Sequence, residues 1–258
     1  MTGASSGVGR AVALELARRG VRVMATARRG ERLQSLAAAA ASGGLRPILV
    51  EVGDITQADF RRRLVSAAVA AFGGLDIVVA AAGSGAVGPF REASADTLVR
   101  IMDVDFLAPV ELVRDALPVL LRGADPAIVL VGSILGHHPL PWHAEYCAAK
   151  AALQSFAGSL RLELAEDGVD VLLASLGPTA SEFWDNLLAG RRAEWSRGTP
   201  LSADVTARIM VRALVRRQRE VLPGWRAKGF AWAARLFPRL IDRAAARRMH
   251  RSTSRAPS

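Results

Sequence analysis

Short apolar segments alternate with helix-like segments along most of this chain. Residues 21–26, 46–52, 75–80, 127–131 and 169–174 are apolar runs typical of buried parallel strands. Between them, apolar residues recur at helical spacing over residues 8–19, 32–41, 57–72, 95–121 and 143–164. This alternation predicts a single α/β domain of three layers, in which helices cover both faces of a doubly wound parallel sheet.

Composition limits the class of protein and its compartment. A chain of 258 residues that is 51% hydrophobic can bury a large core. Its one cysteine, Cys147, excludes an intramolecular disulfide and favours a reducing compartment. No uncharged apolar run reaches the ~20 residues that span a bilayer. We therefore expect a cytoplasmic protein, with peripheral membrane contact as the alternative.

The net charge of +10 is concentrated at the C-terminus. From residue 206 onward, fourteen Lys/Arg and two acidic residues give +12, whereas the rest of the chain carries −2. A nearly neutral body argues against a nucleic-acid partner. We divide the chain into a catalytic domain (1–224), a basic helical extension (225–249) and a disordered tail (250–258).

A tyrosine and a lysine lie four residues apart in the segment 143–164. On a helix, Tyr146 and Lys150 share a face, so the cation favours the phenolate and moves the tyrosine pKa from ~10 toward the working range. Ser133 adds a hydroxyl that can hold a substrate oxygen. The alternative is an ordinary helix with a surface lysine. Against it, Tyr146 is the only tyrosine, and the only other lysine is Lys228.

The chain opens with a glycine-rich turn before its first helix. Gly3, Gly7 and Gly9 let the backbone approach a pyrophosphate, and a helix N-terminus attracts its negative charge. Many strand-to-helix turns have similar glycines, so the motif gains weight only from the others in the chain.

Several spaced motifs together resemble the short-chain dehydrogenase/reductase family. They are T-G-A-S-S-G-V-G from Thr2, A-A-A-G from Ala80, Ser133, Y-C-A-A-K from Tyr146, and L-G-P-T-A-S-E-F from Leu176. The resemblance runs from residue 2 to about 224. It implies a Rossmann-type sheet, a nicotinamide cofactor at the C-terminal strand ends, and hydride transfer at a carbonyl carbon.

The resemblance also implies individual roles. Tyr146 would exchange a proton with the substrate oxygen, Ser133 would orient that oxygen, and Lys150 would lower the tyrosine pKa and bind the nicotinamide ribose. The expected cofactor-binding residues are Gly3, Ser5, Ser6, Gly7, Val8, Gly9, Arg28, Arg29, Asp54, Ala82, Gly83, Tyr146, Lys150, Gly177 and Thr179. We expect no metal.

Four positions depart from the family pattern. Ala80 and Ala81 replace asparagines that brace the central sheet, and Leu176 replaces a proline. Asp105 replaces an asparagine that helps hold a water against the lysine, and its carboxylate would raise the lysine pKa. We place Asp105 with the catalytic residues. The alternative function is a weakly catalytic NADP-binding sensor or scaffold.

Aromatic and proline residues surround the predicted catalytic motifs. A pocket walled by them suits a lipophilic carbonyl or alcohol; ordinary packing is the alternative. These residues are Pro139, Pro141, Trp142, Phe183, Trp184, Leu187, Leu188 and Trp195. His137 and His138 lack metal-ligand spacing and are interpreted as loop residues near the pocket rim.

We hold two expectations about the ends of the chain. Thr2 should follow an apolar strand, the central one of the sheet, so we expect the natural protein to begin further upstream. In the extension, Phe230, Ala234, Phe237, Ile241 and Ala244 form an apolar stripe, with a break expected at Pro238.

That stripe has two interpretations. We favour packing over the pocket or a partner subunit, and the alternative is contact of residues 226–258 with an anionic membrane surface. By analogy with the family we expect a homo-oligomer.

The sequence predicts NADP(H) as the cofactor. An arginine at the end of the second strand accommodates a 2′-phosphate, whereas an NAD site places an acid there, and the first acid after Arg28 and Arg29 is Glu31. NADPH should bind at least tenfold tighter than NADH, about 1.4 kcal/mol, and Arg28→Ala should remove most of this preference. Titration calorimetry with both cofactors checks it, and equal affinities in the unmutated protein would contradict it.

Overall fold

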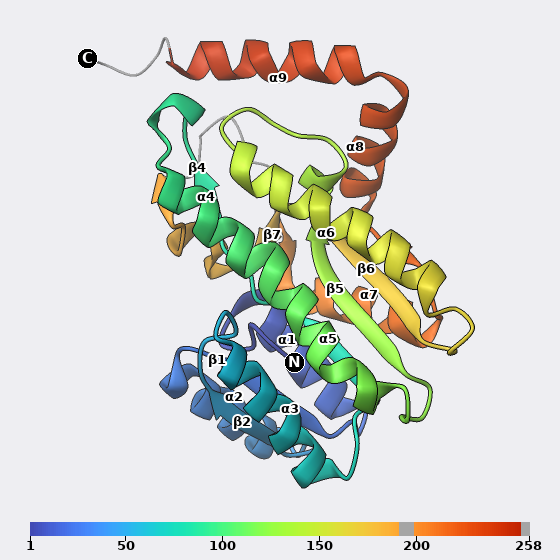
Figure 1. The fold of residues 1–258 in the computed structure, drawn as a ribbon. Helices are drawn as coiled ribbons and strands as arrows, with labels where there is room; N and C mark the ends of the chain where they lie inside the picture. The colour runs from blue at the N-terminus through green and yellow to red at the C-terminus, as the bar shows by residue number, and fades with distance from the viewer. Residues whose placement is uncertain (191–198, 254–258) are drawn as a thin grey trace.

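The computed structural model describes residues 1–190 and 199–253, and three layers are visible in it (Figure 1). The principal strands are β1 (Val23–Ala27), β2 (Ile48–Val52), β3 (Ile77–Ala80), β5 (Ala127–Ser133), β6 (Asp170–Leu176) and β10 (Glu220–Val221). Every pairing among them is parallel. The predicted α/β parallel sheet is therefore confirmed.

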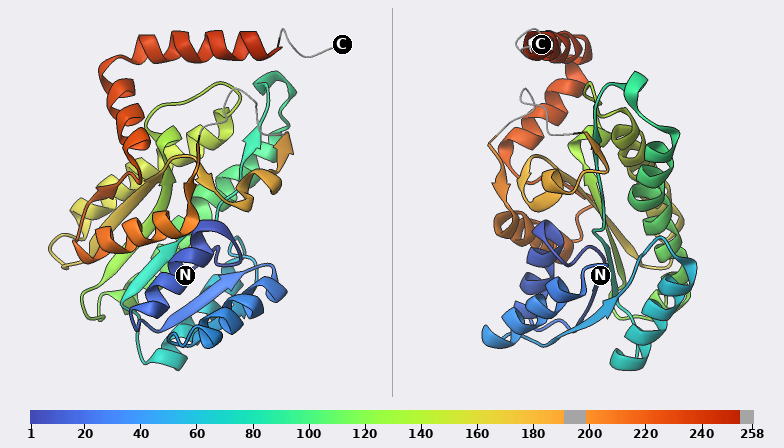
Figure 2. Two further views of the ribbon diagram at one scale, coloured as in Figure 1. Left: turned by 180° about the vertical axis from the view of Figure 1, so that it is seen from behind. Right: turned by 90° about the vertical axis from the view of Figure 1, so that its left-hand side faces the viewer.

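Helices cover both faces of this sheet (Figure 2). They are α1 (Gly7–Arg18), α2 (Gly30–Ser42) and α7 (Ala203–Val215) on one face, and α3 (Ala58–Phe72), α4 (Ala95–Met102), α5 (Ala108–Leu120) and α6 (Ala144–Glu163) on the other. Alternate strand residues supply the two cores: Val129 and Leu172 face the first group, and Ile128 and Leu130 face the second. This is the period-two alternation of a strand that is buried on both faces.

Short elements complete the chain. They are β4 (Ala86–Val87), η1 (Phe90–Glu92), η3 (Ile134–Gly136), β7 (Thr179–Ala180), η4 (Glu182–Asp185), β8 (Ala189–Gly190) and β9 (Leu201–Ser202). The strands β4 and β8 pair with each other, as do β7 and β9. We call residues 179–190 the flap.

The sheet is split where the sequence indicated a missing strand. β1 pairs only with β2, while β3 belongs to a separate group in the order β10-β6-β5-β3. Only the first residues bridge the two parts: Thr26 donates its N–H to the Met1 carbonyl, and Thr2 donates to the Val79 carbonyl, both at 2.9 Å. A cavity of about 490 Å³ lies in the gap, with Met24 and Val78 in its lining. The expectation that the natural protein begins further upstream stays a prediction.

The helix expected over residues 95–121 is interrupted. α4 and α5 are joined by a π-helical turn, η2 (Asp103–Leu107), which adds a residue to one turn and changes the direction of its side chains. The buried Asp105 lies in this turn, so the interruption sets the geometry of the site described below. Helical periodicity alone does not reveal such a bulge.

The C-terminal extension forms two helices, α8 (Trp225–Leu236) and α9 (Pro238–Thr253), with Pro238 at the start of the second. The predicted break is confirmed. The predicted stripe is wrong at Phe237 and Ala244, which are exposed. Phe237 lies between the helices with φ −132° and ψ 53°, outside helical geometry, so it leaves the stripe. α9 continues past residue 249, and residues 254–258 lie outside the described part of the chain.

Candidate active site

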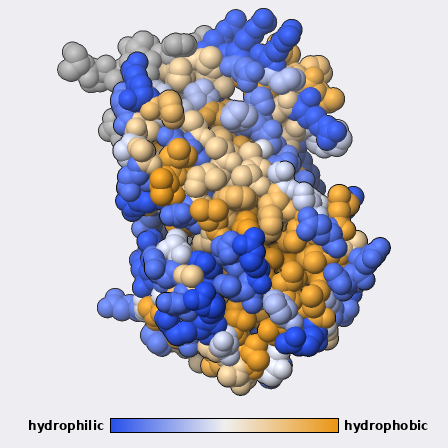
Figure 3. All heavy atoms as spheres, in the orientation of Figure 1, coloured by the Kyte–Doolittle hydropathy of each residue, from blue (hydrophilic) through white to orange (hydrophobic). Residues whose placement is uncertain are grey.

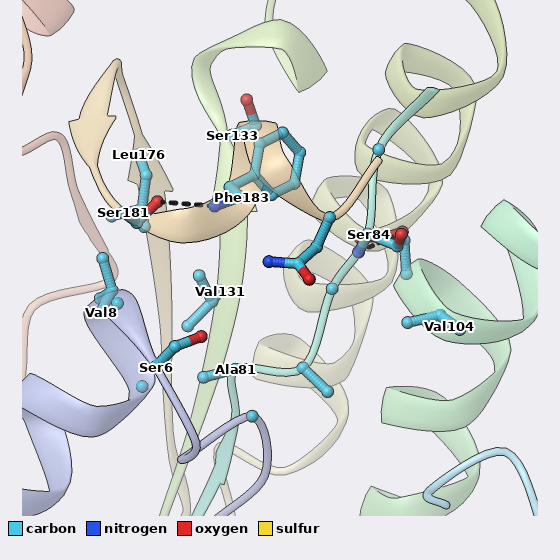
Figure 4. A pocket seen from close by; sticks show the side chains of 18 of the residues that line it. Ser6, Val8, Ala81, Ser84, Val104, Val131, Ser133, Leu176, Ser181 and Phe183 are labelled. Carbon is cyan, nitrogen blue, oxygen red and sulfur yellow. Dashed lines mark hydrogen bonds between the residues drawn. The ribbon is translucent and has the colours of Figure 1, made fainter. Parts of the chain in front are cut away.

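One cavity of about 380 Å³ brings the predicted residues together at the carboxyl ends of the strands. Figure 4 shows Ser6 and Val8 of the first turn on one side and Ser84 and Val104 on the other. Its lining includes each predicted site residue: Gly3, Ser5, Ser6, Gly7, Val8, Gly9, Arg28, Arg29, Asp54, Ala82, Gly83, Asp105, Ser133, Tyr146, Lys150, Gly177 and Thr179. A crevice at this end of a doubly wound sheet is where such folds bind ligands.

Tyr146 and Lys150 meet on the cavity side of α6. The Lys150 Nζ lies 5.7 Å from the centroid of the Tyr146 ring. Burial raises the pKa of Tyr146, while the Lys150 charge lowers it, the Asp105 charge raises it and hydrogen bonding by Ser133 lowers it. The net shift is upward. The Lys150 charge therefore acts in the direction that the sequence predicted, but burial outweighs it, so the pKa of Tyr146 is not brought toward neutrality.

Lys150 is paired with Asp105 in the interior. The ammonium lies 2.9 Å from Asp105 Oδ1 and donates to the Val131 carbonyl at 3.0 Å. The two residues are only 4% and 0% exposed. Burial acts to lower the pKa of Lys150, but the charges of Asp105 and Tyr146 raise it, so the lysine stays protonated. Burial raises the pKa of Asp105 against the opposing effect of Lys150.

The glycine turn packs closely against neighbouring backbone, at positions where a side chain would not fit. Gly3 has φ +67°, and a side chain there would lie 2.5 Å from the Ala81 carbonyl oxygen. On Gly9, a Cβ would lie 2.1 Å from the Gly3 oxygen. Among the described residues, no side chain caps the N-terminus of α1, and the first residues of this helix, Gly7, Val8 and Gly9, line the cavity. These features fit a pyrophosphate, as the sequence predicted.

The arginines near the end of β1 differ in their contacts. Arg29 donates from Nη2 to Ser6 Oγ at 2.7 Å and to Ser5 Oγ at 3.1 Å. Arg28, favoured from the sequence as the phosphate ligand, is exposed and lines the cavity. Asp54 accepts from Thr56, which fixes the start of the loop before α3. A basic cluster therefore lies at this end of the cavity.

Aromatic side chains form part of the opposite end. The Phe183 ring packs against Tyr146 at 5.6 Å and against Trp184 at 5.3 Å between centroids. Leu140 and His143 complete this wall. The wall predictions were wrong for Pro139, Pro141, Trp142, Leu187 and Leu188, which are outside the lining; Trp195 lies outside the described residues.

His137 and His138 do not line the cavity, which corrects their assignment to its rim. His137 Nε2 lies 2.7 Å from Glu220 Oε1, and His138 Nε2 lies 3.0 Å from Asp242 Oδ1. They connect the loop after β5 to β10 and to α9. Contacts separated by 83 and 104 positions leave no local sequence signal.

Sequence reasoning also missed polar residues around the cavity. Thr2 Oγ1 accepts from the N–H groups of Ala81 and Ala82, both at 3.1 Å, and so braces the segment whose asparagines are missing. Glu182 of the flap lines the cavity and pairs with Arg29. Thr2 belongs to the glycine motif and could have been included. Glu182 belongs to the motif that begins at Leu176, but its pairing had no signal, because its partner lies 153 positions away.

Metal binding and membrane spanning are two further properties to consider for the described residues, 1–190 and 199–253. In that part of the chain no cluster of three or more His, Cys, Asp or Glu side chains could hold a metal ion. Over the same residues, no helix combines the length and hydropathy needed to cross a bilayer.

Comparison with known proteins identifies the family. A model of the short chain dehydrogenases matches residues 1–192. An uncharacterized oxidoreductase of Myxococcus xanthus is 34% identical, with 96% of each chain covered. A Xenopus laevis protein named hydroxysteroid 11-beta-dehydrogenase 1-like protein B is 32% identical, over 93% of this chain and 82% of that protein. A Streptomyces avermitilis short-chain dehydrogenase structure superposes with a TM-score of 0.81 at 26% identity, covering 93% and 92%.

The chain therefore belongs to the short-chain dehydrogenase/reductase family. It is an oxidoreductase that acts on alcohols or carbonyls, in a family that uses NAD(P)(H).

The buried ion pair of Lys150 and Asp105 should affect the stability of the fold. Lys150→Met removes the cation and leaves the Asp105 carboxylate in an apolar site, which should cost ~3–5 kcal/mol of unfolding free energy. The folded pKa of Asp105 then lies above its unfolded value of ~3.9. The folded state of this variant binds the Asp105 proton more tightly than the unfolded state does. Its free energy of unfolding is therefore higher at acid pH and falls as pH rises through the folded pKa.

Urea unfolding at several pH values checks this. The double variant Lys150→Met/Asp105→Asn has no buried carboxylate and serves as the control. Identical pH dependence of the single and double variants would contradict the prediction.

Proposed function

We propose that this protein is an NADP(H)-dependent oxidoreductase that reduces a ketone or aldehyde on a lipophilic molecule, or oxidises the corresponding alcohol. One observation carries the proposal: Tyr146, Ser133 and Lys150 share one cavity with the glycine turn. A proton-transfer group therefore lies beside a place where a dinucleotide fits.

The chemistry follows from what each group can donate. When bound, the nicotinamide supplies a hydride to the carbonyl carbon or accepts one from the alcohol. Tyr146 donates its hydroxyl proton to the substrate oxygen during reduction and takes it back during oxidation. Ser133 holds that oxygen by a hydrogen bond, and the Lys150 ammonium stabilises the phenolate that Tyr146 becomes.

Asp105 acts through Lys150. Its carboxylate keeps the buried ammonium charged, which preserves the cation that Tyr146 needs. The same negative charge opposes formation of the phenolate. We assign Asp105 as a positioning residue rather than one that touches the substrate.

The basic end of the cavity supports NADP(H) over NAD(H). Arg28 and Arg29 lie there, and Arg32 follows in the first turn of α2. Arginine binds phosphate oxygens through charge-assisted hydrogen bonds, and the 2′-phosphate is the group that distinguishes the two cofactors.

The walls of the other end support a lipophilic substrate. Phe183, Trp184 and Leu140 offer apolar surface next to Tyr146. The named hydroxysteroid dehydrogenase relative fits a substrate with an apolar body and one oxygen to transfer. An apolar lining with few polar groups is typical of sites for such molecules.

A weakly catalytic sensor or scaffold is the second candidate. It is favoured by the Asp105 carboxylate, which lies on the lysine and holds the pKa of Tyr146 up. A sensor would bind NADPH and change shape without turnover. Enzyme and sensor are separated by the tyrosine variant.

Tyr146→Phe removes the proton donor and leaves the ring that packs on Phe183. We expect NADPH oxidation with apolar ketones and aldehydes to fall at least ~100-fold, the usual contribution of general acid catalysis, with NADPH affinity changed less than threefold. Absorbance at the NADPH band measures turnover. Equal, slow turnover in both proteins would support the sensor.

The first helix of the extension, α8, exposes large apolar side chains. In α8, Ala227 and Ala234 are buried, whereas Trp225, Trp232 and Leu236 are 78%, 64% and 61% exposed at positions i, i+7 and i+11. These three large apolar side chains therefore lie on one face of α8, opposite the face that packs on the body.

Basic residues are frequent in the extension. Residues 225–249 hold seven Lys/Arg and one acid, and Figure 3 shows hydrophilic residues gathered over the upper part of the molecule, where α9 lies in Figure 1. We propose that the extension contacts an anionic membrane surface, where interfacial tryptophans and flanking cations are both stabilised. Because a two-fold contact between copies would face this positive patch with itself, we disfavour self-association through it. A homo-oligomer through another face stays a prediction.

Liposome sedimentation tests the membrane contact. The protein should pellet with anionic but not zwitterionic liposomes at low salt, and high salt should release it. Trp225→Ser/Trp232→Ser should abolish pelleting, while Phe90→Ser, which removes an aromatic that is 72% exposed elsewhere, should not. Protein that stays in the supernatant at low salt refutes the proposal.

A further inference from the structure

The flap is tied to the cofactor end of the cavity by a carboxylate. Glu182 Oε2 lies 3.0 Å from Arg29 Nη1, and its Oε1 lies 2.9 Å from Arg32 Nη1. Within the described residues, this is the only acidic side chain that forms an ion pair with either arginine. One side chain therefore joins η4 to α2 across the mouth of the site.

Arg29 extends the connection to the glycine turn. Its Nη2 donates to Ser5 and Ser6, so the guanidinium is shared between the turn and the flap. Ser181, the residue before Glu182, also lies close to the turn: a Cβ on Gly7 would lie 2.8 Å from the Ser181 Cβ. Figure 4 shows Ser181 across from Val8, above the start of α1.

The bridge has the properties of a reversible contact. The side chains of Arg29, Arg32 and Glu182 are 39%, 54% and 34% exposed, so water screens the pairs and each contributes little to stability. Hydrogen bonding by Arg29 lowers the pKa of Glu182, which keeps the carboxylate charged at neutral pH. Because each ion pair is weak, an anion that binds Arg29 more strongly can replace the Glu182 carboxylate.

We infer that Glu182 is a specificity-determining residue: it occupies Arg29 in the absence of cofactor, and a phosphate on the adenosine ribose must displace it to bind there. The inference rests on the proposed NADP(H) site. It follows that phosphate binding and the position of the flap are coupled, because the same arginine cannot satisfy both anions fully.

Fragments of the cofactor isolate the contribution of the ribose phosphate to binding. Adenosine 2′,5′-bisphosphate carries the ribose phosphate and 5′-AMP lacks it, so the ratio of their dissociation constants reports on the phosphate alone. Glu182→Gln keeps the shape of the side chain and removes its charge. The ratio should shift at least threefold further toward the bisphosphate, as measured by titration calorimetry.

Asp185→Asn is the matched control. Asp185 is exposed, lies in the same short helix, and forms no ion pair with the described residues, so its variant should leave the ratio unchanged. In the protein without nucleotide, hydrogen exchange of flap residues 182–190 should be faster in Glu182→Gln than in Asp185→Asn.

The outcomes distinguish the two proposals. A bisphosphate preference in the unmutated protein that Glu182→Gln leaves unchanged would overturn the role of Glu182 and preserve the NADP(H) assignment. No preference in either protein would overturn both. A preference that emerges only in Glu182→Gln would support the role of Glu182 and contradict NADP(H) selectivity in the native chain.

Discussion

The ion pair between Lys150 and Asp105 is the constraint on which the site depends. Two opposite charges with almost no access to water persist only when each is held by the other and by further hydrogen bonds. Val131 of β5 and the N–H of Ser84 supply those bonds. The pair thus fixes α6 against β5 and against the loop after β3. Tyr146, one turn before Lys150, is positioned by the same contacts.

Much of this arrangement was predictable because it is local or periodic. The principal helices and the five longer strands follow from apolar spacing, and the motifs placed Tyr146 and Lys150 in one cavity. What the sequence did not reveal depends on geometry between distant segments. The π-helical turn that directs Asp105 inward has no periodic signature, and the flap contact of Glu182 joins positions 153 apart. The tyrosine pKa also depended on burial, which spacing does not measure.

The two ends of the cavity use charge in different ways. Beside Tyr146, a single cation is buried and its charge is preserved by a buried acid, so small changes in solvation move the proton chemistry. At the ribose end, two arginines, Arg29 and Arg32, are partly exposed and share the Glu182 carboxylate. Because water screens these ion pairs, replacing one anion by another there costs little free energy. The first arrangement suits a fixed reaction centre, and the second suits a ligand that must enter and leave.

Lysine is rare in this chain. Arginine is far commoner in this chain, yet position 150 holds one of its two lysines. A compact ammonium has three donors; here one meets Asp105 Oδ1 and one meets the Val131 carbonyl. A planar guanidinium is larger, and its fixed fork is a poorer match to two acceptors that come from different elements. The geometry of the pair therefore favours lysine over arginine at this position, independently of any resemblance to other proteins.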